Sequence, residues 1–170
     1  MDRVTKYNYA VSSHTGSRDL TIALNAEASS IIGVVDSETR GTVRVAAIDL
    51  QTFVSEHDID RIDILKVDIE GAEVEVLDAA PDQLLQSVRQ ITIEFHDFNG
   101  VVSLHDVRRV RQRLKRLGFA CFRLPPWRYV DTLFVNRDWI RPRLVDRVHW
   151  LALPFRRRLQ RALAGEGSHA

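Results

Sequence analysis

Acidic residues follow a short apolar run in the middle of the chain. Asp68, Glu70 and Glu73 come directly after residues 62–67, which are mostly isoleucine, leucine and valine. If the run is a buried inner strand, its alternation places Asp68 at the carboxyl end of the strand, on the same face as Lys66. Burying an isolated charge is costly, so a carboxylate in this position needs either a partner or a function.

A second pair of titratable residues ends the next predicted strand, residues 90–95. Glu94 and His96 lie on one face of it. If the two strands are adjacent, these side chains converge with Asp68 and Glu70, and the crowded carboxylates raise one another's pKa values or attract a cation. Such a group suits proton transfer from a substrate hydroxyl or amide. Asp68, Glu70, Glu94 and His96 are therefore the candidate catalytic residues, and no metal ligands are assigned.

Each of these residues also has a structural interpretation. We interpret Glu73 as a surface residue in the first turn of a helix, where the helix dipole favours a negative charge, rather than as a catalyst. Lys66 can pair with a nearby acid. Glu94 and His96 are equally compatible with a structural hydrogen bond and with a role in a site.

The order of the elements that position these residues predicts an α/β fold. Strand and helix alternate from about residue 43 to 135, which is typical of βαβ units in a mainly parallel sheet, with an antiparallel strand near the C-terminal end. Ligands of such sheets bind beyond the carboxyl ends of the strands. The predicted strands are 7–11, 20–24, 41–46, 62–67, 90–95, 119–124 and 132–135, and the predicted helices begin near residues 49, 72, 81 and 103.

Composition is that of a globular protein of ordinary size. The chain has 170 residues, 45% of them hydrophobic and 28% charged, with a single cysteine, no signal-peptide pattern and no apolar run that could span a membrane. A cytoplasmic location is the simplest expectation. We divide the chain into a domain over residues 1–138 and a basic amphipathic tail over 139–170.

Charge is distributed unevenly along the chain. Residues 1–100 carry 8 Lys/Arg against 18 Asp/Glu, a net charge of −10, whereas residues 101–170 carry 16 against 5, a net charge of +11. The basic part could bind nucleic acid or an anionic membrane surface. Because the aromatic interleaving of nucleic-acid-binding folds is absent, we favour charges that are solvated or that pair with the acidic part, and we expect no nucleic-acid partner.

The residues 62–77, which read IDILKVDIEGAEVEVL, closely resemble the signature of FkbM-type methyltransferases. Residues 9–12, 47–50 and 93–96 are similar to further elements of that family, and the resemblance extends over about residues 7–135. It implies a Rossmann-like methyltransferase domain that uses S-adenosyl-L-methionine and methylates a hydroxyl of a sugar, another glycan or a small natural product. It also implies that Asp68 lies near the methyl donor or the acceptor, with Glu70, Glu94 and His96 on the acceptor side.

The chain departs from the methyltransferase pattern on the donor side. Such enzymes hold the donor with a glycine-rich turn after the first strand and an acidic residue at the end of the second. The only closely spaced glycines here are Gly165 and Gly167. We therefore expect an N-terminally truncated domain whose isolated form binds the donor weakly. The alternative is a non-catalytic remnant that associates with itself or with a complementing chain, because a sheet without its first strands exposes an apolar edge.

Overall fold

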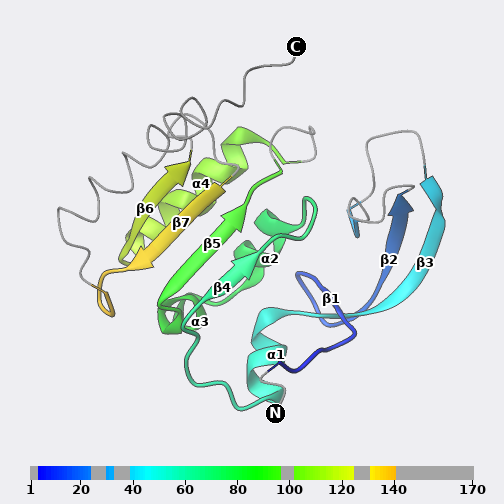
Figure 1. The fold of residues 1–170 in the computed structure, drawn as a ribbon, viewed down its shortest axis with the longest axis horizontal. Helices are drawn as coiled ribbons and strands as arrows, with labels where there is room; N and C mark the ends of the chain where they lie inside the picture. The colour runs from blue at the N-terminus through cyan, green and yellow to red at the C-terminus, as the bar shows by residue number, and fades with distance from the viewer. Residues whose placement is uncertain (1–3, 24–29, 33–38, 97–101, 125–130, 141–170) are drawn as a thin grey trace, which may run out of the picture.

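The computed structural model describes residues 4–23, 30–32, 39–96, 102–124 and 131–140. Within them the chain forms two sheets with helices packed against the larger one (Figure 1). No helix in this part of the chain is long and apolar enough to cross a membrane. Of the predicted tail, residues 139–170, the part from residue 141 onward lies outside the described residues.

The smaller sheet comes from the N-terminal part of the chain. It contains β1 (Ala10–Val11), β2 (Gly16–Ala23) and β3 (Thr39–Ile48) in the order β1-β3-β2. Strands β2 and β3 pair antiparallel, and β1 pairs with the end of β3 in parallel. The chain then enters α1 (Leu50–Glu56), whose N-cap is the predicted Asp49: its carboxylate accepts a hydrogen bond from the backbone N–H of Thr52 at 2.8 Å.

The larger sheet has four strands in the order β4-β5-β7-β6. Only β4 and β5 are parallel, because β7 runs antiparallel to both of its neighbours. Helices α2, α3 and α4 contribute the buried residues that cover one face of this sheet (Figure 1). The elements are β4 (Leu65–Val67), α2 (Glu73–Ala79), α3 (Asp82–Ser87), β5 (Gln90–Glu94), α4 (Leu104–Arg116), β6 (Phe119–Leu124) and β7 (Asp131–Asn136).

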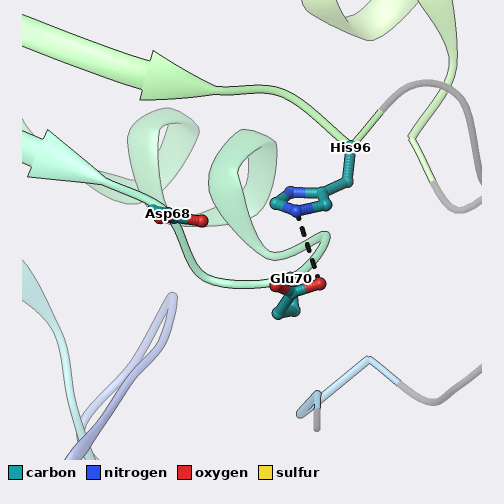
Figure 2. A group of neighbouring side chains, drawn as sticks. All are labelled: Asp68, Glu70 and His96. Atoms are coloured by element: carbon teal, nitrogen blue, oxygen red, sulfur yellow. Dashed lines mark ion pairs between the residues drawn. The ribbon is translucent and has the colours of Figure 1, made fainter. Parts of the chain in front are cut away.

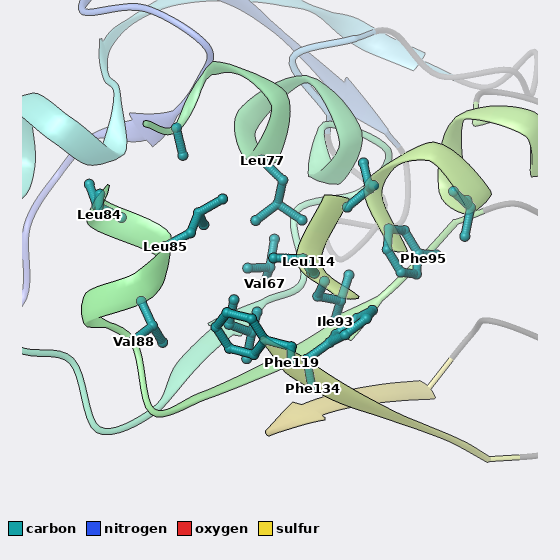
Figure 3. Packing of buried hydrophobic residues seen from close by; sticks show 14 of the residues in the cluster. Val67, Leu77, Leu84, Leu85, Val88, Ile93, Phe95, Leu114, Phe119 and Phe134 are labelled. Carbon is teal, nitrogen blue, oxygen red and sulfur yellow. The ribbon is translucent and has the colours of Figure 1, made fainter. Parts of the chain in front are cut away.

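The core of the molecule lies between this sheet and its helices. The predicted alternation in β5 is confirmed, since Ile91, Ile93 and Phe95 are all buried. The apolar side chains of α4 pack against the same core, with Val110 and Leu114 among its buried residues, and Figure 3 shows Leu114 within the cluster. Burial of each such side chain stabilises the fold by about 1.5–3 kcal/mol, so a register slip of one residue in β5 would be strongly unfavourable.

Two features of the predicted fold need correction. The described sheets are mixed rather than mainly parallel, because β2, β6 and β7 join their neighbours antiparallel. Strand β4 was predicted to be an inner strand, yet among the described strands it lies at the edge of its sheet. Ile64, just before β4, is accordingly 65% exposed. An apolar run looks the same in an inner and an edge strand, so the sequence did not distinguish them.

Candidate functional site

The acidic turn that follows β4 has a strained backbone. Glu70 has a φ of 52° and Gly71 a φ of 102°. A positive φ costs glycine little, but it is unfavourable for glutamate. A hydrogen bond from the hydroxyl of Ser30 to the carbonyl oxygen of Glu70, 2.6 Å long, helps to hold this conformation. The turn therefore fixes the Glu70 side chain at the carboxyl end of β4.

His96 follows β5 and lies between two carboxylates. Its Nδ1 is 2.8 Å from Oε1 of Glu73, and its Nε2 is 3.3 Å from Oε2 of Glu70. Figure 2 shows the imidazole of His96, which follows β5, directed at Glu70. Asp68 lies nearby, where the chain leaves β4. The side chain of His96 is only 6% exposed. The parallel pairing of β4 with β5 thus brings the ends of both strands to one site, as predicted.

Opposing effects act on the pKa of His96. Burial lowers the pKa, because the charged imidazolium loses solvent. The carboxylate of Glu73 raises it through charge and through its hydrogen bond, and Glu70 and Glu94 raise it further. The carboxylates prevail, so the pKa of His96 lies above its ordinary value of 6.5. His96 can therefore hold a proton between two acids.

Asp68 and Lys66 form an ion pair on one face of the strand, as the alternation predicts. The Nζ atom of Lys66 lies 2.5 Å from Oδ2 of Asp68. This hydrogen bond and the charge of Asp68 raise the pKa of Lys66. The pair leaves Asp68 partly exposed at the end of the strand, beside the turn that carries Glu70.

A cavity of about 610 Å³ borders these strand ends. A volume of this size accommodates a small-molecule ligand. Asp68, Glu70 and Glu94 line it, and so does Tyr9, which directly precedes β1 of the other sheet. The remaining lining residues are Ala10, Val11, Leu20, Ile31 and Ile69. The predicted candidate Glu94 therefore shares this cavity with the other acids, whereas His96 is buried behind it and contacts Glu70.

Three of the four predicted site residues also have the geometry of potential metal ligands. Single ligand atoms of Asp68, Glu70 and His96 all lie within 4.8 Å of one another. Carboxylate oxygens and an imidazole nitrogen suit several divalent cations. The ammonium group of Lys66 already occupies one oxygen of Asp68, however, so a cation would compete with it.

The position of Glu73 differs from the one predicted from the sequence. It was predicted to lie at the surface, but it is completely buried. Besides its contact with His96, its Oε1 accepts hydrogen bonds from the backbone N–H groups of Gly71 at 3.0 Å and Ile69 at 3.3 Å. A signal was present in the sequence: Glu73 precedes the apolar Val76 and Leu77 by three and four residues, which is the spacing of one buried helix face.

Two arginines of the basic helix α4 pair with the acidic part of the chain. Arg113 contacts Asp82 at 2.5 Å and donates to the carbonyl oxygens of Leu77 and Ala80, both at 2.6 Å. Arg109 forms an ion pair with Asp78. For these two arginines, pairing between the oppositely charged parts of the chain is confirmed.

The described residues thus define an α/β protein with acids and a buried histidine at the carboxyl ends of two adjacent parallel strands. A family model described as the methyltransferase FkbM domain matches residues 2–121. The chain therefore belongs to the FkbM methyltransferase family, as the resemblance indicated.

Among curated proteins, the AMB antimetabolite synthetase AmbE of Pseudomonas aeruginosa is 32% identical over 108 residues. The matched region covers 61% of this chain and 5% of AmbE, so the chain corresponds to a small part of that protein. No solved structure matches.

Proposed function

We propose that this chain is a Rossmann-like methyltransferase domain that transfers a methyl group from S-adenosyl-L-methionine to a hydroxyl of a sugar or a natural product. The observation that carries the proposal is the convergence of Asp68, Glu70 and His96 at the carboxyl ends of β4 and β5 in an FkbM methyltransferase domain. Open α/β sheets bind their ligands at such strand ends. The cavity beside the acids gives an acceptor access to them.

The described residues fit one end of the methyl donor. When bound, the donor supplies an electrophilic methyl group on a positively charged sulfur, which becomes a neutral thioether as the methyl leaves. The three carboxylates that line the cavity match this positive charge, and Asp68 is the residue that we assign to donor binding. The described glycines are widely separated and form no glycine-rich turn for the rest of the donor.

The chain's own residues manage the proton of the acceptor. A hydroxyl must lose its proton as its oxygen forms the new bond to carbon, and a general base within hydrogen-bond reach assists this step. Glu70, which lines the cavity, is the residue that we propose for this role, and His96, which lies 3.3 Å from it and away from the cavity, is the group that we propose to receive the proton from it. Glu94, on the same cavity, accepts a hydrogen bond from the acceptor and orients it.

A second candidate function is association with another chain without catalysis. The edge position of β4 and the exposure of Ile64 favour it. A second cavity, of about 620 Å³, lies beside this edge and is lined mainly by apolar and aromatic side chains, including Tyr7, Phe53 and Ile62. A second copy of the chain or a complementing chain could cover this surface.

Titration of the chain with S-adenosyl-L-methionine by calorimetry separates the two functions. We expect binding weaker than micromolar, since the described residues contain no glycine-rich turn for the donor, and we expect Asp68→Asn to weaken it further. Asp63→Asn is the matched control, because Asp63 precedes β4 and is not among the residues that line the cavity beside Asp68. Micromolar binding by the chain alone would refute the expected weakness. If the chain does not bind the donor, or if Asp68→Asn leaves the affinity for the donor unchanged, the result favours association over catalysis.

A further inference from the structure

Two edge strands of the described structure border one apolar cavity. β4 is an edge of the four-stranded sheet, and β1 is an edge of the three-stranded sheet. The cavity of about 620 Å³ is lined by Tyr9 and Val11 from the side of β1 and by residues 61–65 from the side of β4. Figure 1 shows β1 and α1 on the side of β4 that faces away from β5. The edge of β4 that no described strand pairs with therefore adjoins this cavity.

The apolar side chains around this cavity are poorly covered. Tyr7, Tyr9 and Ile64 are large hydrophobic residues that are exposed, and all three line the cavity. Helix α1 contributes Leu50 and Phe53 to the lining, yet none of its residues is buried. A helix of an α/β protein normally buries its apolar face against strands. Among the described residues, this surface is thus an exposed apolar patch of the kind that marks an interaction site.

The two edges indicate an extended strand as the occupant of the cavity. The backbone groups of a strand can pair with those of β4, whereas a helix satisfies its backbone groups internally and leaves the edge of β4 unpaired. A single strand that lies between β4 and β1 must have both of its own edges free. Every described strand of this chain already pairs with at least one neighbour, so the described part of a second copy offers no such strand. The occupant is therefore a segment that belongs to no sheet of its own.

We propose that this cavity binds an extended apolar segment of a second polypeptide, which adds a strand to the edge of β4 and packs against α1. The inference rests on the association that we propose as the second candidate function, and it identifies the chemistry of the partner. Backbone hydrogen bonds to β4 supply affinity, and apolar side chains that enter the cavity supply specificity. Because Tyr9 and Val11 line both cavities, the bound segment lies next to the acids of the candidate site.

A fluorescently labelled peptide with five valines between two pairs of lysines tests the proposal on the full chain. The valines favour an extended strand, and the lysines keep the peptide soluble. We expect saturable binding with a Kd below about 1 mM, measured by fluorescence anisotropy. Ile64→Lys should weaken this binding at least about tenfold, because it places a charge in the apolar cavity at the edge of β4. Since Ile64 is exposed, the fold itself does not depend on it.

Val43→Lys is the matched control variant, because Val43 is an exposed apolar residue of β3 that lines neither of the two cavities. We expect it to bind the peptide as the wild type does. A control peptide carries proline in place of the second and fourth valines. It keeps the charge of the first peptide, including any attraction to the acids of the candidate site, but it cannot form the backbone hydrogen bonds of a strand. We expect this peptide not to bind.

Three results would overturn the proposal: no saturable binding of the valine peptide, equal binding by Ile64→Lys and the wild type, or equal binding of the proline peptide. Sedimentation of the full chain without peptide tests the competing occupant. If the chain forms a dimer that Ile64→Lys dissociates, a second copy covers the surface, so association holds but the proposed partner is wrong. Peptide binding needs no methyl donor, so a failure of methyl transfer leaves these results unchanged.

Discussion

The positive φ of Glu70 leads to a prediction about two substitutions at that position. Glu70→Gly should be more stable than Glu70→Ala, because the backbone there has a φ of 52°. Both variants lose the carboxylate and its contact with His96, so this contact cancels in the comparison. What remains is the backbone conformation, which glycine adopts without the steric cost that a Cβ brings.

The expected difference is about 1 kcal/mol. A left-handed φ costs an L-residue roughly 1–2 kcal/mol, and the greater freedom of glycine in the unfolded chain takes back about 0.4–1 kcal/mol. Loss of the partly exposed ion pair with His96 costs each variant up to about 1 kcal/mol. Glu70→Gly should therefore unfold close to the wild type, with Glu70→Ala below both by roughly 2–4 °C in Tm.

Guanidinium unfolding followed by circular dichroism measures this difference. Asp58 provides a matched control, because its φ of 51° is nearly the same and it lies on the surface after α1. Asp58→Gly should exceed Asp58→Ala by a similar amount. If glycine gains at position 58 and gains nothing at position 70, the backbone explanation for Glu70 is wrong.

Two further predictions concern residues away from the strand ends. Asn136→Ala should lower the free energy of unfolding by about 2 kcal/mol, because its buried side-chain amide donates to the carbonyl oxygens of Gln86 and Val88, both at 3.1 Å. Urea unfolding checks this, and a loss below about 0.5 kcal/mol would contradict it. Asp49→Asn should reduce the loss of stability in acid. Burial raises the pKa of Asp49, but hydrogen bonds, including those from Thr52, lower it from 3.8 to about 2. Because the folded pKa lies below the unfolded value, the contribution of Asp49 is complete above pH 3.8 and is lost as the pH falls toward 2. Unfolding midpoints at several pH values measure this effect, and an equally steep decline in the variant would count against it.

Local sequence patterns predicted most of the helices and strands, but they did not predict which strands lie next to one another in the sheets. The alternation of Ile91, Ile93 and Phe95 and the capping of α4 by Ser103 are encoded within a few residues, and the structure shows both. The edge position of β4 depends on which strands pair across long distances in the sequence. Since the apolar residues 62–67 suit an inner strand equally well, this part of the prediction was wrong.

The candidate site was likewise predicted in part. Asp68, Glu70 and His96 could be placed together from the sequence, because carboxyl ends of adjacent parallel strands meet at one edge. Glu73 was misplaced because the helix dipole explains an acid in a first turn without any burial. Its buried contact is with His96, which is 23 residues away and approaches through the pairing of β4 with β5.

The unfavourable features of the site also bear on its function. Glu70 adopts a left-handed backbone conformation, and Glu73 is a completely buried acid; both flank the imidazole of His96. Either feature alone has ordinary explanations: Asp58, also at positive φ, lies in an exposed turn. Two energetically costly features thus meet at one buried, titratable side chain, and Glu73 also accepts the backbone N–H groups of Ile69 and Gly71 in the turn between them. Such costs concentrate where a protein uses them, so the geometry of His96 is where we expect the chemistry of this domain to depend most on individual residues.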